Sequence, residues 1–401
     1  MNQPKIIELT EHQPKLFERD ELDIEIAELI WKNYKDLIDV DFPSIKTNNK
    51  YKLKPRGWVG QIILTPELHI YIKPKVPISN LFGMLEYAYQ LKSFKIFDNQ
   101  FTQCQTVDDF YSRLAAILAD KILSRSRRGL YRTYIPVSSH LSAIRGKIDL
   151  RETVKKPWNV KLKCHYDEQT ADIEDNQILL WTLYVIGRTG LCSLAVSPKI
   201  RKAYHVLNGL VTHRSFQGKD CVNRSYNRLN QDYKIMHSLC RFFLDNCGAS
   251  HQVGNYTMFP FLVNMANLYE LFVAEWLKDK LPRHFPNLSV RTQSPVYIGK
   301  IRRRIDIEIY DTTTQNTLYI LDTKYKLPDD KPSNSDIDQV NTYATAKNCS
   351  KAVLVYPENL RNKFYEPVGE SNIWVRSLTF SINEDLERAG QNFLKSLFAE
   401  D

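Results

Sequence analysis

Residues 302–326 read RRRIDIEIYDTTTQNTLYILDTKYK, and this stretch decides the fold of the C-terminal part of the chain. Two runs with the period-two pattern of β-strands flank a short polar turn. Isoleucines alternate with Asp306 and a second acidic residue in the first run, whereas Asp322 and Lys324 share one face of the second. If the two runs pair as a hairpin, Asp306 and Asp322 meet at the same end.

Two carboxylates beside an ammonium group suggest metal-dependent hydrolysis. Carboxylate oxygens are hard ligands of the kind that Mg²⁺ prefers. We expect Asp306 and Asp322 to bind the metal at an exposed strand end. Glu308 lies on the carboxylate face of its strand and is either an auxiliary group or merely exposed. An Asp-x-Lys triplet alone is weak evidence, because a solvated surface ion pair gives the same pattern.

Helices are predicted on both sides of this hairpin. Upstream, residues 264–281 have helical periodicity and are apolar nearly all round, which favours a buried helix. Glu270 lies within that apolar surface, and a carboxylate there needs a partner such as a metal ion. Downstream, Gln339 and Tyr343 are four residues apart in DIDQVNTYATA and therefore share one helical face.

The composition indicates a globular protein with a mild preference for polyanions. The 401 residues carry a formal net charge of +9, with basic clusters around Arg127 and Arg303. The seven cysteines form no C-x-x-C pair, which argues against a zinc ribbon or a disulfide framework. No signal-peptide pattern and no apolar run of membrane-spanning length is present. We therefore expect a cytoplasmic protein with no membrane partner.

The periodicities divide the chain into three expected domains of an α+β multidomain protein. Residues 1–79 read as a β-rich N-terminal domain, a small sheet or partly closed barrel. Residues 80–255 read as a mainly helical region. Residues 256–401 read as an α/β domain with the order α-β-β-β-α-β-β-α and a mixed central sheet, because KAVLVYPE is a continuous apolar strand.

Two features of the middle region allow more than one interpretation. Arg127 and Arg128 lie at a predicted helix end, and Arg145 precedes Gly146 in IRGKIDL. These arginines could complement the helix dipole, contact DNA phosphates, or act on a nucleotide bound by a partner. A second feature is an acidic cluster ahead of a buried helix, which we interpret as helix capping rather than a metal site; it comprises Asp172, Asp175 and Asn176.

The order of these elements resembles the PD-(D/E)xK nuclease superfamily, and the Gln-x-x-x-Tyr pair resembles its RecB-like branch. Ile305 stands where that superfamily often has proline. From residue 80 onward the chain also resembles the McrC family, the nuclease subunits of McrBC-type modification-dependent (5-methylcytosine) restriction systems. The matching stretches are NLFGMLEYAY, SRRGLY, IRGKIDL, YDEQTADIEDNQIL, NMANLYELF, LDTKYK and LVYP.

This resemblance implies a function in defence against foreign DNA. It implies an McrB-like partner, a hexameric AAA+ GTPase that reads modified cytosine and translocates double-stranded DNA. The McrC-type chain docks on that ring through its N-terminal part, stimulates GTP hydrolysis and cuts DNA. GTP belongs to the partner, because no Walker motif G-x-x-x-x-G-K-[ST] occurs here.

The resemblance also implies roles for the candidate residues. Asp306 and Asp322 would bind Mg²⁺, and Lys324 would orient the attacking water and offset transition-state charge. Glu270 would be an accessory ligand, and Thr323 could offer its backbone carbonyl. The pair formed by Gln339 and Tyr343 would support the site or contact the DNA backbone.

Two alternatives remain open. The chain could be a stand-alone RecB-like repair nuclease, although some 255 N-terminal residues without a nucleotide site argue against it. It could instead be a non-catalytic adaptor that activates an AAA+ ring, although the intact acidic residues and lysine argue against a decayed site.

Overall fold

The computed structural model describes most of the chain, namely residues 5–65, 67–91, 106–247, 251–253, 256–258, 260–326, 331–369 and 373–399. The chain forms two compact units. The first contains residues 1–110, 250–256 and 260–401, and the second contains residues 111–249 and 257–259. Both ends of the chain therefore belong to one unit. The expected boundary at residue 255 lies outside the described residues.

The N-terminal part of the first unit is β-rich, as predicted. It contains the helix α1 (Ile24–Tyr34), the 3₁₀ turn η1 (Ile45–Thr47) and two sheets. The smaller sheet has the order β2 (Lys15–Phe17), β4 (Tyr51–Pro55), β3 (Ile38–Asp41). The larger has the order β1 (Lys5–Thr10), β6 (Leu68–Lys73), β5 (Trp58–Thr65), β12 (Phe261–Asn264).

The edge strand β12 comes from the C-terminal range and pairs antiparallel with β5. Gly60 makes this approach possible. Its φ is +139°, and a Cβ there would lie 2.1 Å from the carbonyl oxygen of Phe261. The N-terminal sheet is therefore completed by the segment that leads directly into the next helix.

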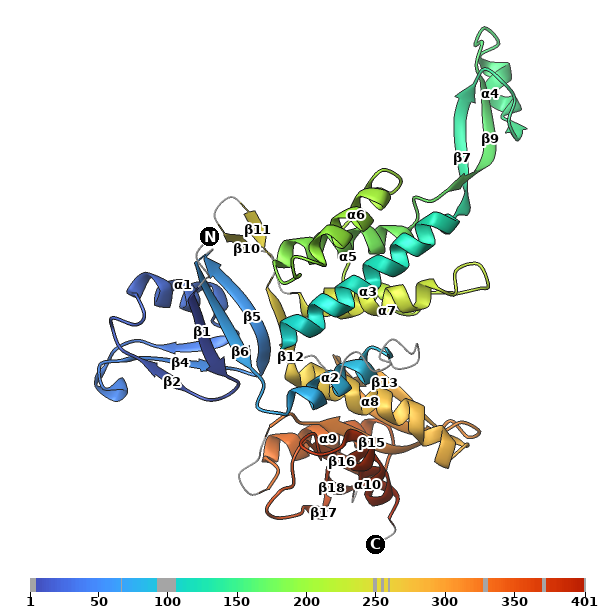
Figure 1. Ribbon diagram of the computed structural model, residues 1–401. Helices are drawn as coiled ribbons and strands as arrows, with labels where there is room; N and C mark the ends of the chain where they lie inside the picture. The colour runs from blue at the N-terminus through green and yellow to red at the C-terminus, as the bar shows by residue number, and fades with distance from the viewer. Residues whose placement is uncertain are drawn as a thin grey trace. The chain divides into compact units, whose positions relative to one another are not determined.

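That helix opens the α/β part of the first unit (Figure 1). Its six-stranded mixed sheet has the order β13 (Leu288–Ile298), β14 (Ile301–Asp311), β15 (Thr317–Thr323), β16 (Lys351–Tyr356), β18 (Ile373–Thr379), β17 (Tyr365–Val368). The helices of this part are α2 (Ile78–Ala88), α8 (Met265–His284), α9 (Asn334–Ala346) and α10 (Leu386–Phe398). The structure confirms the predicted element order after residue 264 and adds the edge strand β17.

The side chains of β16, α8 and α2 explain where these elements form and where they pack. β16 is buried from Ala352 to Tyr356, so it reads as a continuous apolar run with a neighbour on each side. Asn264 caps α8 by accepting a hydrogen bond from the backbone N–H of Asn267 at 3.0 Å. The α2 helix, expected in the middle region, belongs instead to the first unit, where Asn80 donates to the carbonyl of Ile382 at 2.8 Å.

The second unit is helical with one β-structure that the sequence did not predict. Its helices are α3 (Val107–Arg128, mostly within this unit), α5 (Glu174–Thr189), α6 (Ser197–Asn208) and α7 (Tyr233–Asn246), with the 3₁₀ turn η4 (Gly218–Cys221). A long hairpin projects from them (Figure 1). It is built from β7 (Thr133–Leu141), β9 (Leu162–Thr170), β8 (Lys147–Ile148) and α4 (Leu150–Lys155). Most of its side chains are exposed or half-exposed, so no apolar alternation marks it. The short strands β10 (His251–Val253) and β11 (Tyr256–Met258) lie where the chain changes units.

Candidate active site

The predicted hairpin forms, and the candidate residues gather where its strands separate. β14 and β15 pair antiparallel from Ile307 opposite Leu321 to Tyr310 opposite Thr317. Just past the first of these pairs, Asp306 Oδ2 accepts hydrogen bonds from the backbone N–H of Thr323 at 3.0 Å and from its hydroxyl at 3.2 Å. Thr323 thus fixes the Asp306 carboxylate relative to the end of β15.

Asp322, Lys324 and Gln339 form a closed polar set. Lys324 Nζ lies 2.5 Å from Asp322 Oδ2 and donates to Gln339 Oε1 at 3.1 Å. Gln339 Nε2 donates to Asp322 Oδ1 at 3.2 Å and to the hydroxyl of Tyr343 at 3.1 Å. The amide therefore turns its oxygen to the cation and its nitrogen to the carboxylate. The helical pair Gln339 and Tyr343 holds the Asp-x-Lys triplet from the side of α9.

The sequence suggested that Asp322 lies at an exposed strand end, and this expectation is wrong. Its side chain is 1% exposed, because the neighbouring strand β16 and the helix α9 cover this part of β15. The alternative that Glu308 is merely an exposed residue is also wrong. Glu308 is 1% exposed and accepts hydrogen bonds from Thr317 at 2.6 Å and Lys347 at 3.0 Å. It is a buried structural carboxylate on α9's side of the sheet.

Asp336 is a site residue that the sequence analysis missed. It is buried in the first turn of α9, 2.5 Å from Lys326 Nζ and 3.7 Å from Lys324 Nζ. Burial acts to raise its pKa, but hydrogen bonds from Lys326 and Ser333 outweigh burial and lower it. The sequence held a signal, since Ser333-x-x-Asp336 is a capping pattern, and the Ser333 side chain accepts from the Asp336 N–H.

Three carboxylates around the strand ends repel one another. Burial, with the negative charge of Asp306, raises the pKa of Asp322 to about 7. Burial and the same charge raise the pKa of Glu270 to about 7, against a hydrogen bond from Gln293. Burial also raises the pKa of Asp306, although Thr323 and Lys324 oppose it. Clustered carboxylates with raised pKa values form a site for a positive charge.

Lys324 carries such a charge but does not neutralise the cluster alone. Burial acts to lower its pKa, yet Asp322, Asp336 and Asp306 together raise it, so the amine stays protonated. Tyr356, at the end of β16, is fully buried and its hydroxyl has no hydrogen-bond partner among the described residues. Burial and the charges of Asp336 and Asp322 raise its pKa. No sequence pattern pointed to this hydroxyl.

The residues fit a magnesium ion that keeps part of its water shell. No three His, Cys, Asp or Glu side chains in the described part of the chain form a ready metal cluster. Mg²⁺ in proteins is held by one or two carboxylates and several waters, so a full side-chain cage is not required. Asp322 Oδ2 is buried and contacts the Lys324 ammonium at 2.5 Å, and among the described residues it has no hydrogen-bond donor in good geometry. Asp306 and Asp322 would hold the ion, with Glu270 as a third carboxylate.

A groove of about 510 Å³ opens beside this set. One wall comes from the β13–β14 hairpin and the other from α9. Gln339 and Tyr343 belong to both the groove lining and the polar set. The complete lining is Ile298, Ile301, Arg303, Ser335, Asp338, Gln339, Thr342 and Tyr343.

The three candidate arginines of the second unit lie at two separate places, two of them at the end of α3. Arg127 and Arg128 end α3, as predicted, and Arg128 lies 3.6 Å from Asp232. Arg145 stacks over the ring of Tyr166 at 4.2 Å and lies 3.9 Å from Glu168, both on β9. Arg127 is exposed and forms no ion pair with any described residue.

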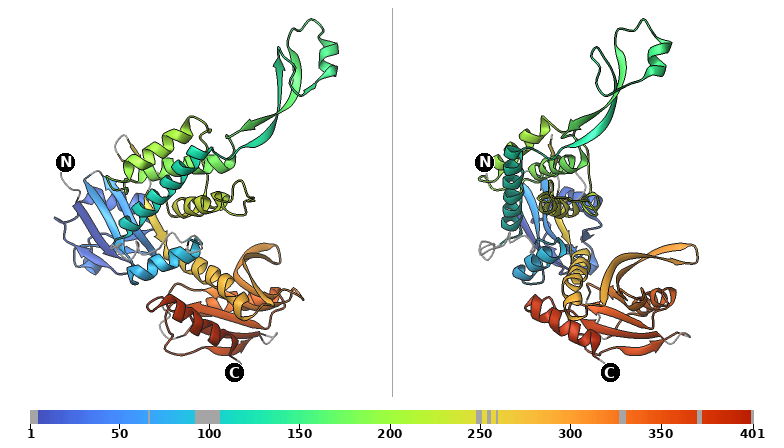
Figure 2. Two further views of the ribbon diagram at one scale, coloured as in Figure 1. Left: turned by 45° about the vertical axis from the view of Figure 1, so that its right-hand side comes forward. Right: turned by 90° about the vertical axis from the view of Figure 1, so that its right-hand side faces the viewer.

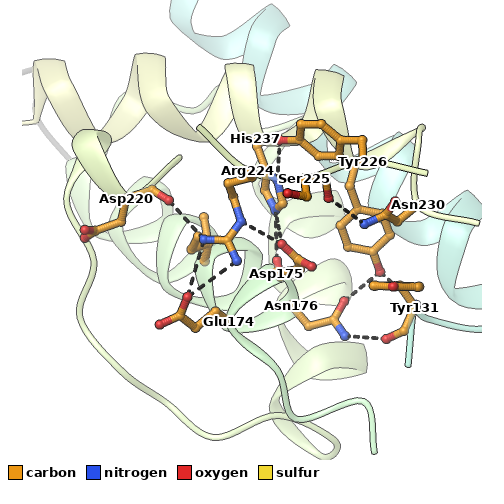
Figure 3. Close-up of polar contacts among 12 residues, drawn as sticks. Tyr131, Glu174, Asp175, Asn176, Asp220, Arg224, Ser225, Tyr226, Asn230 and His237 are labelled. Carbon is orange, nitrogen blue, oxygen red and sulfur yellow. Dashed lines mark hydrogen bonds and ion pairs between the residues drawn. The ribbon is translucent and has the colours of Figure 1, made fainter. Parts of the chain in front are cut away.

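The acidic cluster before α5 does not cap the helix, so that interpretation is wrong. The N-cap position is Ile173, and no side chain caps it. Asp175 instead accepts from Arg224 Nε at 2.7 Å. Asn176 is buried and donates to the carbonyl oxygen of Tyr131 (Figure 3). It also donates to the carbonyl oxygen of Ala171.

Asp172 has a different partner, since it accepts from the backbone N–H of Thr212 at 2.8 Å. Asp172 and Asp175 therefore tie the start of α5 to segments that follow it, whereas Asn176 ties it to the segments that precede it.

His237 is buried beside this network. Its Nε2 lies 3.1 Å from the carbonyl oxygen of Asp175, which can only accept, so Nε2 bears the proton. Nδ1 then accepts from the hydroxyl of Tyr226 at 2.9 Å (Figure 3). Burial lowers the pKa of His237 to about 4, against the attraction of Asp175. The side chain is a neutral structural group of the second unit.

Sequence comparison identifies the family. Residues 53–357 match the family described as "McrBC 5-methylcytosine restriction system component". Because this range is well over half of the chain, the protein belongs to that family. It is 26% identical over 216 residues to the Escherichia coli (strain K12) protein "Type IV methyl-directed restriction enzyme EcoKMcrBC". That alignment covers 52% of this chain and 61% of the relative's length.

Structure comparison agrees at the level of the fold. A chain in the "refined half-complex from tetradecameric assembly of Thermococcus gammatolerans McrB AAA+ hexamers with bound McrC" is 18% identical with a TM-score of 0.52. The superposition covers 98% of this chain and 99% of that chain. In the described part of this chain, no helix is both long and apolar enough to cross a membrane.

Proposed function

We propose that this chain is the DNA endonuclease subunit of a GTP-dependent, modification-dependent restriction complex. The observation that carries the proposal is the convergence of Asp306, Asp322, Lys324 and Gln339 at the separating ends of β14 and β15. The order of these residues resembles the PD-(D/E)xK superfamily, and the family match supports a restriction function.

Each residue of the set has a chemical task in this proposal. Asp306 and Asp322 hold Mg²⁺, and Glu270 adds a third negative charge. The bound ion would polarise the scissile phosphate and lower the pKa of a water nucleophile. Lys324, kept protonated by its acidic neighbours, stabilises negative charge that develops on the phosphate. Gln339, itself hydrogen-bonded to Tyr343, holds the side chains of Lys324 and Asp322 in place.

The proposed partner is an McrB-like AAA+ GTPase hexamer. The similar solved chain comes from an assembly of McrB AAA+ hexamers with bound McrC, which supports this partner. In this division of labour the partner binds GTP and reads 5-methylcytosine, and this chain cuts double-stranded DNA and stimulates GTP hydrolysis. Residues 80–255 would provide docking, and residues 256–401 would provide cleavage.

The test combines the purified chain, an McrB-like GTPase, GTP, Mg²⁺ and a duplex containing 5-methylcytosine. Asp322→Asn removes a proposed ligand while keeping the shape of the side chain, and should abolish cleavage without loss of GTPase stimulation. Asp41→Asn is the matched control and should cut normally, because Asp41 is an exposed carboxylate that pairs with Lys52. Cleavage by the Asp322→Asn form would refute the site.

The same assay separates the two alternatives. Full cleavage by this chain without partner and GTP would favour a stand-alone RecB-like nuclease. Stimulation of the GTPase with no cleavage by the wild type would favour a non-catalytic adaptor.

A further inference from the structure

The distal half of the β13–β14 hairpin leaves the sheet as a two-stranded ribbon. β15 pairs with β14 only from Ile307 onward, whereas β13 pairs with β14 up to the terminal pair of Ile298 and Ile301. Residues 301–304 therefore extend beyond the paired end of β15 over about 13 Å, at roughly 3.3 Å per residue. Gly299, with φ of +59°, forms the tight turn. Figure 2 shows this arched ribbon in orange.

The ribbon carries positive charges that the fold does not use. Within the described residues, none of its four cationic side chains forms an ion pair, and all are exposed; they are Lys300, Arg302, Arg303 and Arg304. Arg291, at the sheet end of the same hairpin, behaves differently. It lies 3.6 Å from Glu308 and stacks over Tyr310 with 3.6 Å to the ring centroid. The structural arginine is paired, whereas the distal four face solvent.

The two faces of the ribbon have different neighbours. Arg303 and Ile301 are two residues apart and share a face, and both line the groove against α9. Arg302 and Arg304 project from the opposite face. The groove also contains Gln339, which binds both Lys324 and Asp322. The groove on the ribbon therefore borders the candidate active site at Gln339.

Packing anchors the ribbon at this position. An isolated two-stranded ribbon is marginal in water, so its orientation needs support. Val296 and Ile305, one from each strand, are buried in the cluster that contains Val340 and Tyr343 of α9. The ribbon is thus attached to the helix that orients the site.

We propose that the β13–β14 ribbon is an arm that binds the phosphate backbone of double-stranded DNA next to the candidate active site. Unpaired arginines and lysines neutralise phosphates and release counterions, and a two-stranded ribbon has the width to enter a major groove. The hydroxyl of Ser335 adds a polar group to the groove wall, whereas that of Thr342 already donates to the carbonyl oxygen of Asp338 at 2.6 Å. Asp338 is the acidic residue of that wall. This proposal rests on the proposed nuclease function, and it names the ribbon as a contact between that nuclease and its DNA substrate.

The experiment measures DNA binding apart from cleavage. The full-length chain is titrated into a fluorescent duplex in EDTA, and anisotropy is recorded over a range of salt concentrations. Replacing Arg302 and Arg304 with alanine should weaken binding and reduce the slope of log K against log[salt] by about two, one for each arginine removed. Arg303→Ala should reduce the slope by about one. Equal weakening on two duplexes of unrelated sequence is expected, because phosphate contacts carry no sequence information.

A charge-matched control uses Lys32 and Lys35, which are exposed on and just after α1. The double alanine form at these positions should bind DNA like the wild type. An unchanged salt slope in the Arg302/Arg304 variant would overturn the arm. So would weaker binding to one sequence alone, or weaker binding to an McrB-like partner with DNA binding intact.

Failure of the arm and failure of the nuclease assignment give different results. If Asp322→Asn abolishes cleavage while the arm variants bind and cut normally, only the arm is refuted. If the arm variants no longer bind DNA but the wild type never cuts, the arm stands as a DNA-binding element and the nuclease proposal falls.

Discussion

The buried carboxylate of Glu11 accepts a hydrogen bond at 3.2 Å from the hydroxyl of Tyr325, the residue that follows Lys324. Glu11 is fully buried after the end of β1, and Lys75 Nζ lies 4.7 Å from the centroid of the Tyr325 ring. The N-terminal part of the first unit therefore touches the chain immediately beside the candidate active site. This hydrogen bond joins residues more than 300 positions apart.

Glu11 makes the stability of the first unit depend on pH. Burial raises its pKa to about 7, against the attraction of Lys75 and the Tyr325 hydrogen bond. The folded state therefore keeps the proton between the unfolded pKa of 4.5 and about 7, and stability falls as pH rises through this window. Glu11→Gln should remove up to about 3 kcal/mol of this loss. Denaturant unfolding at pH 5 and pH 8 measures it.

The control for Glu11 is Glu8→Gln on the preceding strand β1, where the exposed carboxylate of Glu8 pairs with Lys73. Wild type and the Glu8 variant should share one pH dependence, and Glu11→Gln should be relatively more stable at pH 8. Parallel pH dependence in all three proteins would contradict the prediction.

His237 also makes stability depend on pH, but in the opposite direction: the second unit loses stability as the pH falls. Its folded pKa of about 4 is below its ordinary value of 6.5, so the unfolded state binds the proton first as pH falls. Stability is complete above pH 6.5 and is lost progressively toward pH 4, by about 3 kcal/mol at most. His237→Gln can still donate to Asp175 and accept from Tyr226, and should flatten this loss.

Acid unfolding followed by circular dichroism compares the two forms, with the exposed His205→Gln on α6 as control. If His237→Gln is as acid-sensitive as the wild type, the neutral buried histidine is not the cause.

Asp306→Asn should stabilise the metal-free protein and abolish its response to Mg²⁺. The substitution removes the charge that raises the pKa values of Asp322 and Glu270, so less repulsion remains at pH 8. Thermal unfolding should show a higher Tm for Asp306→Asn without metal. Added Mg²⁺ should raise the Tm of the wild type and of Asp41→Asn but not that of Asp306→Asn. An equal metal-induced shift in all three proteins would place Mg²⁺ elsewhere.

One of the arginines of the second unit should stimulate the partner's GTPase, and Arg127 is the foremost candidate. Arg128 has Asp232 as a neighbour and Arg145 is stacked on Tyr166, whereas Arg127 is exposed without an ion pair among the described residues. An arginine supplied in trans contributes roughly 10³–10⁵ in rate. GTP hydrolysis by an McrB-like partner is measured without DNA, with saturating wild type or each alanine variant.

Loss of stimulation by Arg127→Ala with partner binding retained is the expected result, and Arg201→Ala on α6 serves as the exposed control. Unchanged stimulation in the Arg127, Arg128 and Arg145 variants, with weaker DNA binding, would assign these residues to phosphate binding instead.

The sequence determined the parts of the site that depend on local spacing. Period-two alternation placed Asp306 and Asp322 on the strands of one hairpin, and a separation of four placed Gln339 and Tyr343 on one face of α9. The strand pairing and the Gln339 hydrogen bonds agree with these expectations. Such patterns are readable because they follow from the geometry of a single strand or helix.

Only the tertiary structure decided which groups are buried and which distant residues meet. Asp322 and Glu308 are covered by elements brought together from elsewhere in the chain, so exposure could not be read from their own strands. Asp336 and Tyr356 join the site because α9 and β16 lie against β15. The completion of the N-terminal sheet by β12 likewise depends on a pairing across some 200 residues. Long-range packing selects these neighbours, and no local period encodes them.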